Sequence, residues 1–192
     1  VYKKNAKKTE YSSQDWLEEG EQWGYTCVKR VSNFFVCFEV GKQTQQTCRY
    51  MLTKFAKKIK QPTPENPLTI FSDGNDDYAV VLAELFPTNC MNYGQLIKVR
   101  EKGRVVDKIR RIVYGNPAVE NIETTYVENY NGIIRGQLSR LVRKTKCIGK
   151  RKYRLENALH LFQFYWNFMH VIPRKKLTPA IMEGKATKVW TW

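Results

Sequence analysis

The chain has 192 residues, 42% of them hydrophobic and 13% aromatic, so it can fold around one substantial core and is not expected to be disordered. Its 33 lysines and arginines outnumber 18 acids and give a formal charge of +15, for which nucleic acid is the commonest compensating partner. We see no lipid-anchoring motif and no strongly amphipathic terminal helix, and therefore expect no membrane partner.

The chain has 5 cysteines, an odd number, and no two of them have CxxC spacing. This argues against a zinc ribbon or a disulfide framework. The first ten residues, VYKKNAKKTE, lack the apolar core of a signal peptide. We expect an intracellular protein with reduced thiols, in the cytoplasm and nucleoid or in the nucleus.

The first half of the chain predicts strands followed by helices. Residues 1–15 are polar and lysine-rich, and we interpret them as a flexible basic lead-in. Strands are predicted at 21–28 and 33–40, joined by a turn at 30–32, and a helix at 44–59. The proline-rich segment 61–67 is a loop, and the apolar strand 68–71 ends at Ser72-Asp73-Gly74. A helix at 77–86 could be capped by Asn75 or Asp76.

The second half is more helical. Segments 95–99 and 105–114 flank Lys102-Gly103 and predict a basic hairpin. One helix begins near Thr125, and another spans 154–170 until Pro173 stops it. Residues 16–172 therefore form one α/β domain, a mixed sheet flanked by helices with a helical C-terminal half. Residues 173–192 are a tail with a short helix and an aromatic end that packs on this domain.

Two carboxylates are candidates for chemistry. Asp73 follows an apolar strand and precedes a glycine, where it either faces substrate or simply forms a turn. Glu128 lies at the start of a predicted helix, where Thr125 to Glu128 also fits a capping box. Two acids do not usually hold the metal pair used in phosphodiester chemistry, so a third should come from Glu18, Glu19 or Glu21.

A dense basic series follows Glu128 and is the candidate surface for a phosphate backbone. It consists of Arg135, Arg140, Arg143, Lys144, Lys146, Lys150, Arg151 and Lys152. His160 and His170 lie within an aromatic helix, and we expect packing or surface roles for them. The aromatic residues around them are expected to form core, with base stacking as the alternative.

Several short motifs together carry a resemblance to a known family. They are EQWGY at 21–25, VGK at 40–42, SDG at 72–74, Tyr78, YVENYN at 126–131, RLVRKTK at 140–146, FQFYWNF at 162–168 and the tail from TPA at 178–180 to Trp190. On these residues the chain resembles the catalytic domain of DDE-class insertion-sequence transposases, and is similar to the insertion-sequence-one family and its archaeal relatives.

The resemblance implies a ribonuclease-H-like fold whose sheet carries three acids and two Mg²⁺ or Mn²⁺ ions, used to nick a transposon end and join it to target DNA. It gives Asp73 the second catalytic role and Glu128 the third, both as metal ligands. The first acid would precede the EQWGY block, but Gly20 stands there. Glu19 and Glu21 are the adjacent candidate ligands, although strand alternation directs both to the opposite face, unless a bulge at Gly20 brings one round.

Three functions remain open at this level. The first is DNA transposition and recombination by metal-dependent strand transfer, which would require at least a homodimer. The second is a catalytically inactive, transposase-derived module that binds DNA, with RNA as the alternative ligand. The third is a structural subunit of a larger assembly, in which Trp190 and Trp192 contact the partner.

Overall fold

The computed structural model describes residues 22–142 and 151–192. The described chain has a mixed α/β fold, in which helices flank a two-stranded antiparallel sheet and a three-stranded mixed sheet. The predicted α/β class and flanking helices are therefore correct, while the described strands divide between two sheets.

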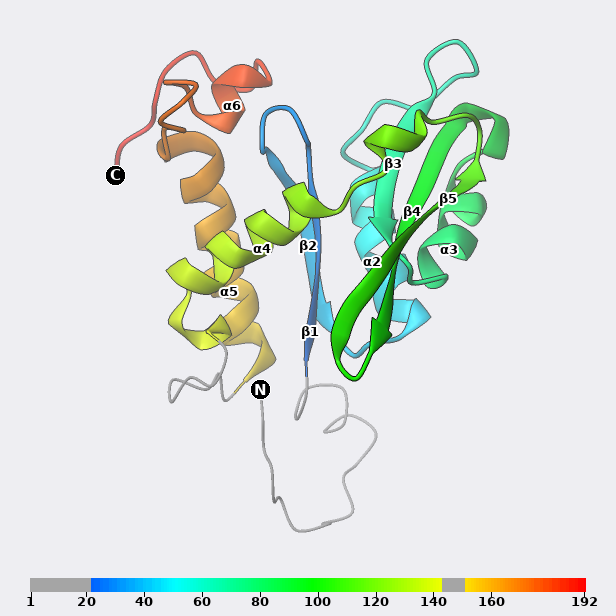
Figure 1. Cartoon of the computed structure of the whole chain (residues 1–192). Coiled ribbons are helices and arrows are strands. Elements are labelled where there is room, and N and C mark those ends of the chain that lie inside the picture. Colours follow the sequence, from blue (N-terminus) through cyan, green and yellow to red (C-terminus); the bar gives the residue numbers. More distant parts are fainter. Residues whose placement is uncertain (1–21, 143–150) are drawn as a thin grey trace.

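The first sheet is the predicted hairpin. Strands β1 (Trp23–Val28) and β2 (Phe35–Gly41) pair in antiparallel register, with Cys27 opposite Cys37. The turn is closed by the Lys29 N–H, which donates to the Phe34 carbonyl at 2.9 Å. Almost every residue of β2 is buried, as expected of the apolar run FFVCFEV. The hairpin is covered on both faces and lies between two groups of elements (Figure 1).

The second sheet has β4 (Met91–Glu101) at its centre. Strand β3 (Leu68–Asp73) pairs with β4 in parallel, and β5 (Arg104–Tyr114) pairs with β4 in antiparallel orientation. Helix α3 (Asp77–Leu85) connects β3 to β4, as parallel pairing requires a crossover. The Asn75 side chain accepts the Asp77 N–H at 3.0 Å, so Asn75 rather than Asp76 caps this helix with its side chain.

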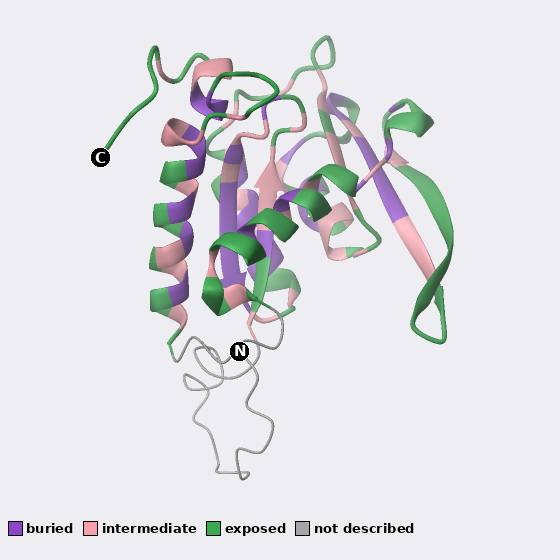
Figure 2. Ribbon diagram, turned by 60° about the vertical axis from the view of Figure 1, so that its left-hand side comes forward, coloured by how far each residue is buried: buried purple, intermediate pink, exposed green. Residues whose placement is uncertain are grey.

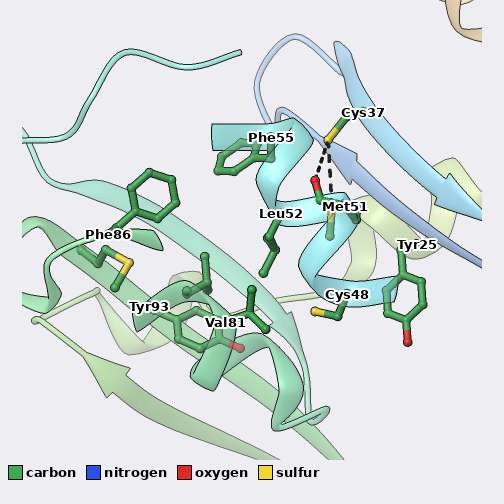
Figure 3. Packing of buried hydrophobic residues seen from close by; sticks show 11 residues of the cluster. Tyr25, Cys37, Cys48, Met51, Leu52, Phe55, Val81, Phe86 and Tyr93 are labelled. Atoms are coloured by element: carbon green, nitrogen blue, oxygen red, sulfur yellow. Dashed lines mark hydrogen bonds between the residues drawn. The ribbon is translucent and has the colours of Figure 1, made fainter. Parts of the chain in front are cut away.

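One core joins this sheet to the hairpin. Helix α2 (Gln45–Ala56) begins at Thr44, whose hydroxyl accepts the Thr47 N–H, and packs between β2 and α3. Its buried side chains meet those of α3 and of β4. Figure 3 shows this packing and the Cys37 thiol directed at Met51, with its sulfur 3.8 Å from the Met51 carbonyl oxygen. This core fixes the sheet that carries Asp73.

A second core lies on the other side of the hairpin. It is formed by α4 (Thr125–Gln137) and α5 (Lys152–Phe164), the latter extended by a π-helical turn, Tyr165–Met169. Aromatic rings fill it, with Phe35 and Tyr130 centroids 5.1 Å apart and Phe162 stacked on Trp166 at 5.9 Å. The predicted helix 154–170 therefore exists, but its last turn widens, and His170 lies just beyond it.

Short elements complete the described chain. Three single 3₁₀ turns occupy Thr88–Cys90, Val119–Asn121 and Ser139–Leu141. Helix α6 (Pro179–Met182) is capped by the Thr178 hydroxyl, which accepts the Ile181 N–H at 3.3 Å. After it, the Trp190 ring packs on Phe168 with centroids 4.9 Å apart.

Candidate functional site

Asp73 is the last residue of β3 and is exposed. Its Oδ1 accepts the Asn75 N–H at 3.4 Å, so the carboxylate helps to shape the turn between β3 and α3. The turn-forming role predicted for Asp73 is therefore correct, and its facing of substrate stays a prediction. The residue forms part of a turn, and it also stands at the carboxyl end of β3, opposite the middle of β4. Ligands of α/β sheets commonly bind at the carboxyl ends of strands.

Glu128 lies in the first turn of α4. The predicted capping box is absent, because the cap residue is Thr124 and not Thr125, and the Thr124 side chain accepts no backbone N–H. The Glu128 N–H donates to the Thr124 carbonyl at 2.9 Å, and the Thr124 hydroxyl donates to Glu128 Oε1 at 2.5 Å. The Glu128 carboxylate therefore does not fold back on the cap N–H as a capping box would.

Lys98 of β4 contacts Glu128 and shares a sheet face with Asp73. Its ammonium group forms an ion pair with Glu128 Oε1. Asp73 pairs with Leu96 in the parallel ladder, and Lys98 is two residues further along β4. Because paired residues and alternate residues of a strand share a face, Asp73 and Lys98 lie on one face of the sheet.

The same face carries further cations on β5. Arg110 is the partner of Leu96, and Lys108 is the partner of Lys98. Asp73, Lys98, Lys108 and Arg110 together are called the basic sheet face below. Arg110 Nη2 lies 2.8 Å from Glu123 Oε1, and its Nε donates to the Ile122 carbonyl at 3.2 Å. The segment that leads into α4 is thus fixed over this face by Arg110 and Lys98.

The cations of this face keep the nearby carboxylates charged. Burial raises the pKa of the Glu128 carboxyl, but hydrogen bonds from Lys98 and Thr124 outweigh burial, so its pKa lies below the ordinary value. Hydrogen bonds from Thr125 and Arg110 likewise lower the pKa of Glu123. Both acids are therefore ionised at neutral pH, and each is compensated by a side chain from the sheet.

We compared this geometry with the needs of a divalent metal, which prefers several carboxylate oxygens. In residues 22–142 and 151–192, no group of three or more His, Cys, Asp or Glu side chains could hold a metal ion. Glu128 already contacts the ammonium of Lys98, which occupies one of its carboxylate oxygens. Glu19 and Glu21, the predicted further ligands, lie outside the described residues, as do Glu18 and Gly20. The described donors therefore do not fit a metal pair.

Half of the predicted nucleic-acid-binding residues can be placed. Arg135 is exposed in the last turn of α4, and Arg140 donates to the Arg154 carbonyl at 3.0 Å. Arg151 precedes α5, and Lys152 lies 3.5 Å from Glu156. Arg135 and Arg140 lie at or just after the end of α4, and Arg151, Lys152 and Arg154 lie at the start of α5. These five residues are called the α4–α5 junction below. Arg143, Lys144, Lys146 and Lys150 lie outside the described residues.

The sequence interpretation overlooked Lys98, Lys108 and Arg110 as site residues. It recognised a basic hairpin but gave its cations no role. The alternation of Lys108 and Arg110 in β5 was the available signal, since alternate strand residues share a face. The pairing of this face with Glu128, across about thirty residues, had no local signal.

The histidines have the packing roles that the sequence indicated. His160 packs against Phe38 with ring centroids 4.7 Å apart, and His170 stacks on Trp166 at 4.4 Å. Burial lowers the pKa of His170, so the ring is neutral at neutral pH. Within residues 22–142 and 151–192, no helix is both long enough and apolar enough to cross a bilayer.

The site thus combines an acid at the end of a β-strand, a second acid in the first turn of a helix, and the cations of the basic sheet face, one of which pairs with the second acid. Comparison with protein-family models, with curated proteins and with solved structures gave no match. The transposase resemblance therefore remains a prediction from the motifs of the sequence.

Proposed function

We propose that this chain is a DNA-binding domain of the DDE transposase type, with a ribonuclease-H-like ancestry and an active site that has lost its metals. The observation that carries the proposal is that Asp73 lies on the same sheet face as Lys98, which forms an ion pair with Glu128. Asp73 and Glu128 are the two positions to which the resemblance gives catalytic roles. An acid at a strand end, and an acid on a later helix that pairs with a lysine of the same sheet face, support this type of site over an unrelated basic protein.

Binding is favoured over strand transfer by the charge of Lys98. Its ammonium group compensates Glu128, which a metal ion would otherwise do. With Gly20 in the position of the first acid, the described chain supplies two carboxylates, and one is already neutralised. A cationic face without metal still binds phosphate through charge-assisted hydrogen bonds.

The phosphate contacts are assigned to the α4–α5 junction and to the basic sheet face. Arg135 and Arg151 are exposed and have no ion-pair partner within residues 22–142 and 151–192. Each phosphate that such a cation neutralises releases condensed counterions, so affinity should fall steeply with salt. DNA is the expected ligand, and RNA is the alternative.

The test measures binding of a fluorescent DNA duplex by anisotropy over a series of salt concentrations. Wild-type protein should show a steep salt dependence. The variant Arg135→Gln with Arg151→Gln should lower the slope of log affinity against log salt by about 2, since each lost phosphate contact removes about 0.9. The matched variant Lys57→Gln with Lys60→Gln removes two exposed charges near the end of α2 and should bind as wild type. Salt-independent affinity would refute the proposal.

Strand transfer is retained as the second candidate because two of the three expected acids reach one face of the sheet. It would need a third acid from residues 18–21, two metal ions, and a homodimer or larger assembly to join two ends. Incubation of the protein with DNA ends and Mn²⁺ decides the question. Nicked or joined products that disappear in Asp73→Ala would establish this activity, and products that persist in the variant would point to a contaminant.

A further inference from the structure

The β4–β5 hairpin continues beyond the rest of its sheet. Strand β3 ends where Asp73 pairs with Leu96, so residues 97–101 and 104–109 pair only with each other in the described chain. Residues 97–109 are called the ribbon below. Figure 2 shows it as an exposed hairpin that projects from the domain, and every residue from 100 to 112 is exposed.

The tip of the ribbon is a two-residue turn. Lys102 has φ of 47° and Gly103 has φ of 81°, the pair of positive values typical of a type I′ turn. Such turns match the right-handed twist of the strands on either side. The ribbon is therefore an ordered element with a built turn, which presents its side chains in a fixed alternation.

The ribbon carries an excess of positive charge. Its cations are Lys98, Arg100, Lys102, Arg104 and Lys108, against Glu101 and Asp107. Lys98 pairs with Glu128, but no ion pair engages the other four cations within residues 22–142 and 151–192. Val105, Val106 and Ile109 beside them are 41%, 53% and 48% exposed. Cations without an ion pair, interleaved with exposed apolar side chains, indicate a surface that is covered by an anionic partner.

A second copy of the chain fits this surface poorly. The outer edge of β5 could pair with another β5, and a symmetric antiparallel register centred on Ile109 would place Lys108 opposite Arg110 at two positions. Two strands that each carry an excess of cations would repel one another, as lysines on edge strands commonly ensure. Charge complementarity instead favours a polyanion.

The width of the ribbon indicates which polyanion. The major groove of B-DNA is about 12 Å wide and admits a two-stranded ribbon, whose strands lie about 4.8 Å apart. There, apolar side chains can contact thymine methyl groups while flanking cations reach phosphates. The major groove of A-form RNA is deep and narrow, so the same ribbon does not enter it.

We propose that the ribbon binds in the major groove of duplex DNA, with Arg100, Lys102, Arg104 and Lys108 on the flanking phosphates. This inference rests on the proposed function and adds a contact surface separate from the α4–α5 junction. Because β3 and β4 are parallel and α2 leads into β3, the ribbon tip and the C-terminal end of α2 lie at opposite ends of the sheet. Removing the charges of Lys57 and Lys60 is therefore a control, because it lowers the net charge by the same amount at a site away from the ribbon.

The experiment compares two double variants. The ribbon variant carries both Arg100→Gln and Arg104→Gln, and the control carries both Lys57→Gln and Lys60→Gln. The probes are a fluorescent DNA duplex, an RNA duplex of the same sequence and a single DNA strand. The ribbon variant should lose about tenfold or more in DNA-duplex affinity, and its salt slope should fall by about 2. The control should match wild type. Duplex DNA should be preferred to both other probes, and hydrogen exchange of wild-type β5 amides should slow when duplex DNA is added.

Salt-dependent binding by wild type that the ribbon variant retains in full would overturn the ribbon and leave the proposed function standing. A lack of DNA binding by wild type would overturn both. If the ribbon variant lost as much affinity for the RNA duplex or the single strand as for the DNA duplex, the assignment to the major groove would be overturned. A dimer that the ribbon variant converts to monomer in sedimentation would identify the ribbon as an interface between copies and so refute the proposal. If the variant fails to fold, unchanged β5 exchange in wild type on adding DNA would refute it.

Discussion

Asn167 forms two hydrogen bonds with the backbone of Phe35, 132 residues away in the chain. Its Oδ1 accepts the Phe35 N–H at 2.8 Å, and its Nδ2 donates to the Phe35 carbonyl at 3.0 Å. Gln163, one turn earlier, donates to the same carbonyl at 2.9 Å. Side-chain amides from the C-terminal helical segment thus complete the edge of β2 that β1 leaves unpaired, and so join the helical half to the hairpin.

We expect Asn167→Leu to destabilise the protein by about 2 kcal/mol, because it leaves the buried Phe35 N–H without a partner. The Phe35 carbonyl keeps Gln163, which limits the loss. Denaturant unfolding followed by circular dichroism measures the change. Asn157→Leu, at an exposed position of α5, is the matched control and should shift stability by less than about 0.5 kcal/mol. Equal effects of the two variants would show that the amide bonds to β2 contribute nothing.

Tyr130 offers the opposite case, a buried hydroxyl without a hydrogen-bond partner in the described part of the chain. Burial raises the pKa of its phenol well above the ordinary value, as expected of an uncompensated polar group. Tyr130→Phe should therefore stabilise the protein by about 1 kcal/mol, since it removes a desolvated group and keeps the ring.

Tyr93 is the comparison for this prediction. Its hydroxyl lies 2.7 Å from the Ser72 hydroxyl, and burial raises its pKa to about 12. Tyr93→Phe should destabilise by about 1 kcal/mol, because the hydrogen bond between the Tyr93 and Ser72 hydroxyl groups is lost. Thermal and denaturant unfolding of both variants would check the opposite signs. A loss of stability in Tyr130→Phe would mean that its hydroxyl has a partner, such as a buried water.

The ion pair of Lys98 and Glu128 can be tested by titration. The Glu128 pKa lies below its ordinary value, because hydrogen bonds from Lys98 and Thr124 outweigh the effect of burial. Lys98→Met should raise this pKa, whereas Lys108→Met, which acts only at longer range, should raise it less. Carbon-detected NMR of the glutamate carboxyl groups follows both. An unchanged Glu128 pKa in Lys98→Met would show that Lys98 and Glu128 do not form an ion pair.

The same pair predicts a pH dependence of stability. A carboxyl whose pKa is lower in the folded state stabilises that state above its unfolded pKa of about 4.3, and the benefit disappears as pH falls through the folded pKa. The difference in unfolding free energy between wild type and Lys98→Met should therefore be present at neutral pH and vanish in acid. It should stay below about 1 kcal/mol, because the Glu128 side chain is 48% exposed.

The sequence alone determined the elements and the class. The apolar run of β2, the prolines of the 61–67 loop and the Lys102-Gly103 turn each act within a few residues, so their local conformations could be predicted. Periodicity likewise located α2, and the start of α4 and the span of α5 with its π-helical turn were predicted to within a few residues. The total charge, which is additive, indicated a polyanionic partner without any knowledge of the fold.

Only the tertiary structure decided which residues meet. The pairing of Asp73 with Leu96 sets the register of β3 on β4, and that register places Asp73 on the face of Lys98. Lys98 then reaches Glu128 on a helix that begins over twenty residues later in the chain. Asn167 reaches Phe35 in the same way. These contacts follow from how whole elements pack, and packing energy is spread over many side chains, so no short motif records them.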